Sequence, residues 1–436
     1  MAANRIPQNP FVTGINIPDG LFCGRWKETA EIINLLRNGN NIVLKSKRRI
    51  GKSSLIKHIL SLPEIRKDYN TFYLDIYGTK DADEFRMLFQ TALLKEPWAT
   101  KTKVKELFNT LLKGLNLSGA SIDPVTGSFS LPGLSFTPNQ IPRIPLVDLF
   151  AAMEGADKPC ICIFDEFQQI EQYPENITAT IRSFVQQMNN TKFIFSGSSR
   201  HMLATMFNDY GMPFYKSAVS VDLEALPLDE YREFCQGLFR ANGKVLDGEA
   251  VDFAYYLFSG ETQLMQQTMN FLFSSTAPGA RADVSDCQRS VMELLRSKDV
   301  DYKEAINRID GQKERNTLVY VAYEGVTEKP MSLASIRRFD LSGAAQVQNA
   351  LHNLGEGQYD YIERIDRGLY TMKDRLFELW LSERMGILPL KFSSCRERYE
   401  KQKRLENQAH VVTISEDREK KRTTVQEAKK KGGRRR

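Results

Sequence analysis

The stretch SKRRIGKSS, residues 46–54, constrains the fold of this chain more than any other feature. It ends in Gly-Lys-Ser, the last three positions of the phosphate-loop pattern G-x-x-x-x-G-K-[ST]. Such a loop needs a buried strand before it and a helix that begins at the lysine, so that backbone N–H groups converge on phosphate. The apolar run of NNIVLKS precedes it, and the apolar positions of SSLIKHILSL recur at helical spacing. The sequence therefore predicts strand, loop and helix in the required order.

The loop motif gives a separate task to each of its last residues. Gly51 lies where the backbone approaches phosphate most closely, the ammonium of Lys52 reaches the β- and γ-phosphates, and the hydroxyl of Ser53 binds Mg²⁺. The other loop residues assigned to nucleotide contact are Ser46, Arg49 and Ser54. Ser46 stands where the pattern has its first Gly, and a positive φ there would cost about 1 kcal/mol or more. The alternative is an ordinary helix start with a solvated lysine.

A second polar site follows the apolar run CICIF. Asp165 and Glu166 come directly after it, so a buried strand would place both carboxylates at the carboxyl edge of a parallel sheet, where ligands bind. Asp165 can hold Mg²⁺ through water, and Glu166 can orient and deprotonate an attacking water. The alternative is a strand end with two solvated acids, but the nearby phosphate loop favours the catalytic interpretation.

A third strand end, in FIFSGSSRHM, carries several hydroxyl groups. Ser196 or Ser198 would sit between the hydrolytic water and the γ-phosphate if this strand ends beside the other two. The alternative is an ordinary strand-to-helix turn in which a serine caps the next helix. Arg200 is either a charge-stabilising cation or a solvated residue, and the sequence favours neither.

In combination, these stretches resemble the archaeal-type ATPases of the P-loop superfamily, relatives of the STAND signalling NTPases and of the origin-recognition branch of AAA+ proteins. SKRRIGKSSL, IFDEFQ and FIFSGSSRHM resemble the family's phosphate loop, metal-and-water site and sensor strand. An opening box, which in the family lies against the nucleotide base, is represented by Phe22, Gly24, Arg25 and Glu28. The resemblance implies an α/β P-loop NTPase core of the ASCE type with a parallel sheet, a helical lid and a C-terminal winged helix. It also implies ATP and Mg²⁺ as ligands.

Three positions depart from that family's pattern. The first loop glycine is replaced by Ser46, and the family's Y-G-R turn reads Phe214, Tyr215, Lys216. A lysine keeps the charge of an arginine but lacks its bidentate fork. SGETQLMQQ stands where the lid tends to carry G-G-x-P. These departures leave room for a slow enzyme or a nucleotide-held switch.

The chain divides into four expected parts. These are an ATPase core at residues 1–225 with a Gly/Pro/Ser-rich insertion at 114–145, a helical lid at 226–300, a winged-helix domain at 301–385, and a basic, disordered tail at 386–436. A helical first part of the tail is the alternative. Within the insertion, SFSLPGLSF alternates around Pro-Gly and predicts a hairpin. That hairpin is either a plain surface insertion or a contact for a partner or DNA.

The expected winged helix has three helices and a wing. The helices are predicted in QKERNTLVYVAYEG, SLASIRRFD and SGAAQVQNALHNLGE, and two strands flank the turn Asp366-Arg367-Gly368. The third helix takes the place of a recognition helix, but His352 is its only near-cation, which is poor for phosphate binding. Arg337 and Arg338 precede it and can help. DNA contact and protein interaction both stay open for this module.

Composition limits the number of domains and the kinds of segment and metal site that we expect in this chain. A hydrophobic content of 42% in 436 residues suffices for the cores of two or three domains. No apolar run reaches membrane-spanning length and the first twenty residues are polar, so we expect neither a membrane segment nor a signal segment. Six scattered cysteines without a CxxC pair, with only four histidines, predict no structural zinc and a reduced, cytoplasmic setting.

The positive charge of the chain is concentrated in its tail. Residues 396–436 contain 15 Lys and Arg against 7 Asp and Glu, a net charge of +8, whereas the whole chain carries +6. A flexible polycation binds nucleic acid through counterion release; a solubilising tail is the alternative. We therefore expect a Mg²⁺-dependent ATPase that acts as a switch or remodeller, with DNA or a protein as partner and an oligomeric state that the sequence does not fix. The alternative is a nucleotide-dependent regulator that does not hydrolyse ATP.

Overall fold

The computed structural model describes residues 9–96 except 15, three short strands between residues 121 and 136, and residues 143–408 except 342, 356 and 367. Contacts divide the chain into two compact units. The first comprises Met1–Ile6 and Gly14–Leu226, and the second comprises Pro7–Thr13 and Pro227–Arg436.

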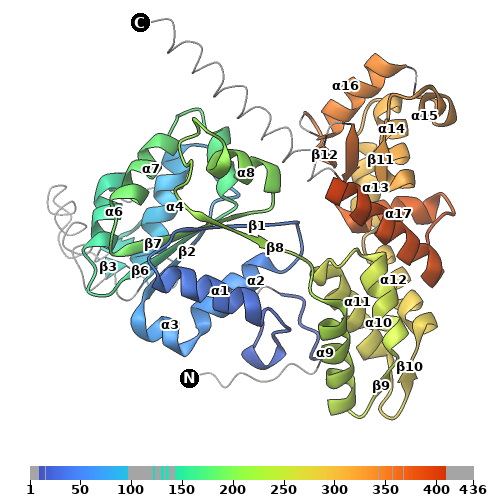
Figure 1. Cartoon of the computed structure of the whole chain (residues 1–436), viewed down its shortest axis with the longest axis horizontal. Helices are drawn as coiled ribbons and strands as arrows, with labels where there is room; N and C mark the ends of the chain where they lie inside the picture. The colour runs from blue at the N-terminus through green and yellow to red at the C-terminus, as the bar shows by residue number, and fades with distance from the viewer. Residues whose placement is uncertain are drawn as a thin grey trace, which may run out of the picture. The chain divides into compact units, whose positions relative to one another are not determined.

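The first unit contains a five-stranded parallel sheet with the order β2-β6-β7-β1-β8 (Figure 1). Its strands are β1 (Ile42–Ser46), β2 (Asn70–Asp75), β6 (Cys160–Asp165), β7 (Thr191–Gly197) and β8 (Val219–Leu223). Because all five strands run in the same direction, their carboxyl ends lie along one edge of the sheet. The order places the segments after β1, β6 and β7 next to one another at that edge.

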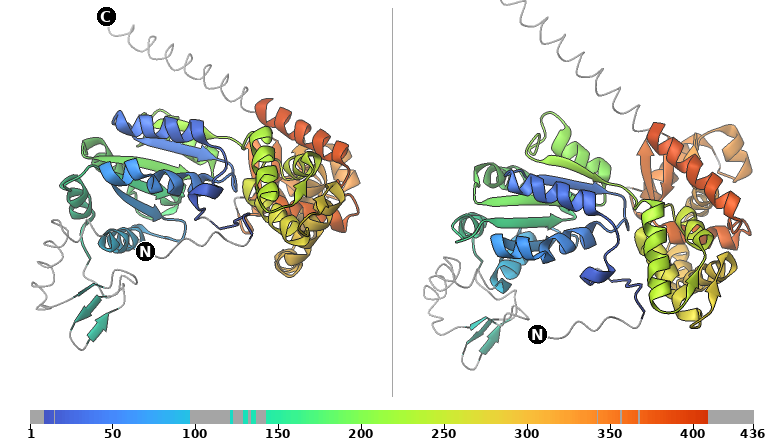
Figure 2. Two further views of the ribbon diagram at one scale, coloured as in Figure 1. Left: turned by 90° about the horizontal axis from the view of Figure 1, so that it is seen from below. Right: turned by 60° about the horizontal axis from the view of Figure 1, so that its bottom comes forward.

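Helices cover both faces of this sheet (Figure 2). One face carries α1 (Trp26–Arg37), α2 (Lys52–Ser61) and α3 (Pro63–Asp68); the other carries α4 (Ala82–Lys95), α6 (Leu146–Glu154), α7 (Thr178–Gln187) and α8 (Arg200–Asn208). Short 3₁₀ helices occur at η1 (Asp19–Leu21) and η4 (Phe167–Gln172). In β6, Phe164 faces a phenylalanine-rich core and Ile163 faces an aliphatic one. This burial on both faces explains why the strand reads as a continuous apolar run.

The insertion forms a small antiparallel sheet of its own. Its strands β3 (Ser121–Ile122), β4 (Phe129–Leu131) and β5 (Leu134–Phe136) pair in the order β3-β4-β5. Pairing of β4 with β5 confirms the hairpin predicted from SFSLPGLSF, while the Pro-Gly turn itself lies outside the described residues.

The second unit begins with a helical domain. Its elements are α9 (Leu228–Ala241), α10 (Gly248–Leu257), α11 (Thr262–Ser275), α12 (Val284–Ser297) and α13 (Asp299–Asn307), with the two-residue parallel strands β9 (Val245–Leu246) and β10 (Arg281–Ala282). A capping box formed by Asp283 and Asp286 fixes the start of α12.

A winged helix follows in the same unit. It consists of α14 (Gln312–Glu324), α15 (Leu333–Arg338), α16 (Ala344–Gly355) and the antiparallel strands β11 (Val326–Glu328), β12 (Ile362–Asp366) and β13 (Leu369–Met372) in the order β11-β13-β12, closed by α17 (Arg375–Arg384). The three predicted helices and both predicted strands are confirmed. Strand β11 was missed because three residues are too few to show a period of two.

The tail expected from residue 386 needs a correction in its first part. Residues 392–408 form a helix, in agreement with the alternative of a helical start. Cys395 in this helix is only 1% exposed, and the guanidinium of Arg398 pairs with the buried carboxylate of Glu378 on α17. Arg375 holds the same carboxylate at 2.6 Å, so this helix is attached to the winged helix by a buried ionic cluster. Residues 409–436 lie outside the described part of the chain.

The expected first domain also needs a correction at its N-terminal end. Residues 9–13 belong to the second unit, where Phe11 is fully buried against the rings of Phe239 and Phe273. Asn270 on α11 donates to the Phe11 carbonyl at 2.8 Å, and the Asn9 amide donates to the Asn270 carbonyl at 2.9 Å. We call residues 9–13 the N-terminal strap. This reciprocal pairing explains how a short extended segment holds its place on a helical domain.

Phe11→Ala should destabilise the second unit by about 3–5 kcal/mol, because it leaves a cavity beside the rings of Phe239 and Phe273. Chemical denaturation followed by circular dichroism would measure the change. The matched control is Phe271→Ala on α11, where the ring is exposed and the expected loss is below about 1 kcal/mol. Equal losses for the two variants would contradict the burial of the strap.

Candidate active site

The phosphate-loop sequence turns from β1 into α2 at the carboxyl edge of the sheet. Helix α2 begins at Lys52, and Gly51 before it has a φ of 95°, a left-handed conformation that favours glycine. A second left-handed residue, Arg49, has a φ of 64°. The strain expected at Ser46 is absent, because Ser46 is the fully buried last residue of β1, paired with Leu223. The turn is therefore made three to five residues later than we expected.

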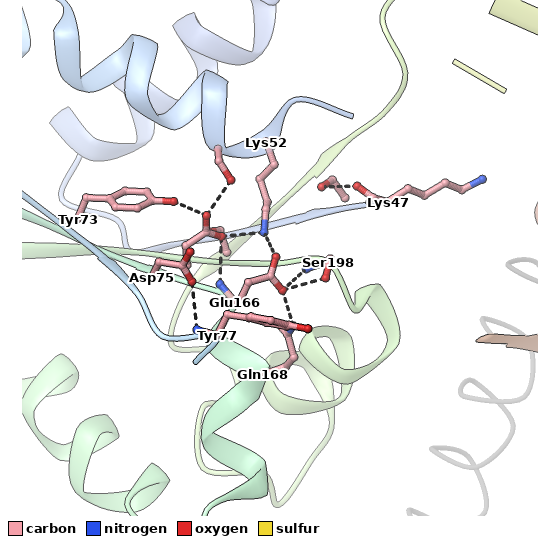
Figure 3. Close-up of polar contacts among 12 residues, drawn as sticks. Lys47, Lys52, Tyr73, Asp75, Tyr77, Glu166, Gln168 and Ser198 are labelled. Atoms are coloured by element: carbon pink, nitrogen blue, oxygen red, sulfur yellow. Dashed lines mark hydrogen bonds and ion pairs between the residues drawn. The ribbon is translucent and has the colours of Figure 1, made fainter. Parts of the chain in front are cut away.

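The side chain of Lys52 lies between the two carboxylates at the carboxyl end of β6, Asp165 and Glu166. The Nζ of Lys52 is 2.8 Å from Asp165 Oδ1 and 3.1 Å from Glu166 Oε1 (Figure 3), and the side chain is only 7% exposed. The structure thus brings the loop after β1 and the acids at the end of β6 into a single site. A buried lysine needs such partners, since an unpaired buried charge is strongly destabilising.

Asp165 accepts hydrogen bonds from five donors. Its Oδ1 accepts from Lys52 Nζ, from Ser196 Oγ at 2.6 Å and from the Glu166 amide. Its Oδ2 accepts from Ser53 Oγ at 2.8 Å and from Tyr73 OH at 2.5 Å. Burial alone would raise the pKa of Asp165, but the charge of Lys52 and these hydrogen bonds outweigh it and lower the pKa to about 2. The carboxylate is therefore ionised at neutral pH.

Glu166 is also tightly held. Gln168 Nε2 donates to its Oε2 at 2.6 Å, and Ser198 donates to the same oxygen from its hydroxyl at 2.8 Å and from its amide at 3.2 Å. Burial would raise the pKa of Glu166, but Lys52 and the hydrogen bonds from Gln168 and Ser198 lower it overall. The backbone at Glu166 has a φ of 57°, a left-handed conformation that costs energy for a non-glycine residue. That conformation lets Asp165 and Glu166 both face the site.

The two candidate serines at the carboxyl end of β7 occupy different places, with Ser196 in the strand and Ser198 directly after it. Ser196 is fully buried and touches Asp165, whereas Ser198 is half-buried and touches Glu166. Gly197 between them is needed for packing, because a Cβ there would collide with Oε1 of Gln168. Of the two, only Ser198 is exposed enough to meet a ligand.

The opening box packs against the phosphate loop from within the same unit. Gly24 and Arg25 both have left-handed backbones, with φ of 62° and 68°. The Arg25 guanidinium donates to the Ile50 carbonyl at 3.1 Å and pairs with Glu28 at 2.7 Å. Phe22 stacks on His58 of α2, with ring centroids 4.0 Å apart. Arg25 is thus bound to protein groups and supports the loop that precedes Gly51.

Some sequence candidates are not brought into the central cluster. Ser54 is partly exposed on the first turn of α2. Arg200 donates to the carbonyl of Leu223 and pairs with Glu224, so it is attached to the end of β8. Lys216 lies on the turn before β8, with its Nζ 5.2 Å from the centre of the Tyr215 ring.

Two residues of the cluster were missed at the sequence level. Gln168 lies in the quoted motif IFDEFQ, but no role had been assigned to it. Tyr73 lies two residues before the end of β2, and only the strand order shows that β2 borders β6. Burial first, and then the charge of Asp165, raise the pKa of Tyr73 well above its ordinary value, so its phenol is a permanent donor. A hydroxyl group between the apolar residues Phe72 and Leu74 was the available signal.

The oxygen atoms of Ser53 and Asp165 suit Mg²⁺ as ligands. Ser53 Oγ and Asp165 Oδ2 lie 2.8 Å apart and offer one hydroxyl and one carboxylate oxygen, the hard ligands that Mg²⁺ prefers. Mg²⁺ commonly takes one or two protein ligands and completes its shell with waters and phosphate oxygens. Ser53 and Asp165 are therefore the residues that would hold the ion.

Structural comparison decides the fold class. A Walker-type ATPase of Pyrococcus abyssi superposes with a TM-score of 0.57 at 17% identity, covering 85% of this chain and 99% of that one. A family model described as a probable winged helix domain matches residues 300–383, from α13 to α17. The chain has the fold of a Walker-type P-loop ATPase with a C-terminal winged helix. The α/β class predicted from the sequence is thereby confirmed.

Other solved structures are similar at lower scores. The ORC1 protein of Aeropyrum pernix, solved in complex with DNA, matches with a TM-score of 0.48 at 13% identity over 87% of this chain and 98% of that one. The Thermotoga maritima RuvB Holliday junction branch migration motor gives 0.40 at 12% identity over 83% and 96%. The search of curated proteins found no match for this chain. Within the described residues, every helix is too short or too polar to cross a bilayer.

The lowered pKa of Asp165 predicts a pH dependence of stability. Because its folded-state pKa of about 2 lies below the ordinary 3.8, Asp165 contributes stability that is present above pH 4 and lost as the pH falls toward 2. The difference in unfolding free energy between wild type and Asp165→Asn should therefore shrink by about 2 kcal/mol across that window. Urea unfolding at closely spaced pH values would measure it. Asp157→Asn, at an exposed position, should show no such change, and parallel curves for Asp165→Asn would refute the assignment.

Proposed function

We propose that this protein binds ATP with Mg²⁺ at the edge formed by β1, β6 and β7 and hydrolyses it. One observation carries the proposal: the loop lysine, Lys52, lies buried against Asp165 and Glu166, so the phosphate-loop and carboxylate motifs form one site. The fold supports the same assignment, since it is that of a Walker-type ATPase. A structural ion pair would explain the Lys52 contacts but not the adjoining left-handed backbone of Arg49, Gly51 and Glu166.

Each residue has a task that follows from its place. Gly51 and the first N–H groups of α2 would surround phosphate at a helix N-terminus, where anions are favoured. Lys52 would move its ammonium from the carboxylates to the β- and γ-phosphates. Bound Mg²⁺ supplies charge neutralisation for the phosphates, with Ser53 as its direct protein ligand and Asp165 holding it through water. Ser46, Arg49, Ser54, Gly24 and Arg25 are assigned to shaping or lining the nucleotide site.

Glu166 is the proposed general base. When Lys52 moves to phosphate, Oε1 of Glu166 loses its partner and can accept a proton from water. Ser198, which touches Oε2, would sense the γ-phosphate through this carboxylate, and Ser196 would support Asp165. In the structure, both oxygens of Glu166 are occupied and its pKa is lowered, which makes it a weak base at rest. This restraint favours slow turnover, and it supports a second candidate: a nucleotide-dependent regulator that does not hydrolyse ATP.

Glu166→Gln should separate the two candidates. If Glu166 is the base, the variant loses about 100-fold or more of its steady-state ATP hydrolysis, because proton transfer is removed while the shape of the site is kept. ATP binding, measured by calorimetry, should persist, whereas Lys52→Ala should abolish it. Glu171→Gln, an exposed position five residues away, is the matched control. Background hydrolysis by wild type, with ATP still bound, would move the assignment to the regulator.

DNA is the partner that we propose for the second unit and the tail. Helix α16 contains no acidic residue, and its exposed positions include Gln346, Gln348 and Asn349, which can form hydrogen bonds with base edges. Arg337 and Arg338 are exposed on the preceding α15. Residues 409–436 add ten Lys and Arg against four acidic residues. The positive charge that binds DNA phosphates would thus come mainly from residues outside the recognition helix. A protein partner is the alternative to DNA.

Deleting residues 409–436 should weaken binding to duplex DNA and flatten its salt dependence. Each phosphate contact adds about 0.9 to the slope of log K against log salt, so losing several contacts lowers the slope by several units. Fluorescence anisotropy at a series of salt concentrations would measure both effects, and ATP hydrolysis with and without DNA would show whether binding is coupled to turnover. An unchanged slope would remove the tail from the interface, and absent DNA binding would favour a protein partner.

A further inference from the structure

The proposed metal site has one donor that the phosphate-loop motifs do not include. Tyr73 approaches from β2, the edge strand of the sheet, and its hydroxyl donates to Asp165 Oδ2 at 2.5 Å (Figure 3). The contact follows from the sheet, because β2 and β6 pair in register with Asp75 opposite Asp165. Tyr73 is two residues before Asp75 and so lies on the same face of β2 as Asp75.

Within the described residues, Oδ2 of Asp165 accepts from two groups, Ser53 and Tyr73. A hydroxyl that ligates a cation through a lone pair keeps its proton, so Ser53 can hold the metal and still donate to Oδ2. Tyr73 is the second donor on that oxygen, while Lys52, Ser196 and the Glu166 amide act on Oδ1. Of the two donors on Oδ2, the phenol is the one that does not itself ligate the ion. It therefore fixes the orientation of the carboxylate plane on its metal-facing side.

We propose that Tyr73 is a positioning residue for Mg²⁺: its hydroxyl holds Asp165 Oδ2 toward Ser53, and its removal weakens metal binding more than nucleotide binding or folding. The inference rests on the proposed function, since it assigns a supporting role within that site. Hydrogen-bond partners of metal ligands typically contribute 10- to 100-fold to metal affinity. Tyr73 does not touch the reacting atoms, and it acts through the carboxylate of Asp165.

The decisive variant is Tyr73→Phe, which removes one oxygen and keeps the ring. Mn²⁺ serves as the probe for Mg²⁺, and its binding to the full-length protein saturated with a non-hydrolysable ATP analogue is followed by electron paramagnetic resonance. We expect the dissociation constant for Mn²⁺ to rise about 10-fold. Binding of the analogue without metal should be unchanged, as should the melting temperature of the metal-free protein. Tyr69→Phe, just before the opposite end of β2, is the matched control and should leave Mn²⁺ binding unaltered.

The outcomes separate this inference from the proposed function. If wild type binds the analogue and Mn²⁺ together but Tyr73→Phe binds Mn²⁺ equally well, the role of Tyr73 is wrong and the nucleotide site stands. If Tyr73→Phe lowers the metal-free melting temperature and weakens the analogue and Mn²⁺ to the same degree, Tyr73 is only a structural residue and the inference fails. If wild type binds no analogue at all, the proposed function fails first, and the inference fails with it.

Discussion

The burial of one ammonium group between two carboxylates governs the arrangement of the first unit. Lys52 begins α2, and its partners Asp165 and Glu166 lie at the carboxyl end of β6, which is separated from β1 in the sheet by β7. Lys52 can contact both carboxylates only if β1, β7 and β6 end at the same level and all run in one direction. A desolvated lysine tolerates no slip in that register, because a shift by one residue would leave it without partners. The sheet order and the chemistry of the site are therefore a single constraint.

Strained backbone collects around the same place. Gly24, Arg25, Arg49, Gly51 and Glu166 all have left-handed conformations, and each lies within one of the nucleotide motifs: the opening box, the phosphate loop or the carboxylate motif. Left-handed residues other than glycine persist only where surrounding contacts fix them. Arg25 illustrates how this is done, since its guanidinium is tied to Ile50 and Glu28. The left-handed residues raise the conformational energy of the loop, but they give it the shape in which its backbone N–H groups can face a phosphate.

Periodicity and motif spacing were enough to predict the central strands, α2, the winged-helix elements other than β11, and the pairing of the loop with the acids. Each of these depends on neighbours in sequence or on a strand that is buried on both faces. Tyr73 was not predictable, because its role depends on β2 bordering β6, a fact of sheet order rather than of local pattern. The expected strain at Ser46 was wrong because the strand continues through that residue. The disorder expected from residue 386 was wrong for residues 392–408, because Cys395 is buried and Arg398 pairs with Glu378 through long-range contacts that a charge-rich sequence does not show.

The N-terminal strap gives the second unit a discontinuous core. Phe11 fills a space between α9 and α11, yet more than two hundred residues separate it from both helices. A fragment that starts at Pro227 would expose Phe239 and Phe273, and it would have to recruit another apolar segment or remain partly unfolded. Within the described residues, the polypeptide crosses between the units twice, before Gly14 and after Leu226. Because the strap is synthesised long before α9 and α11, Phe11 can reach its buried position only after the chain has grown past residue 275. Docking of the strap is therefore a late event in synthesis.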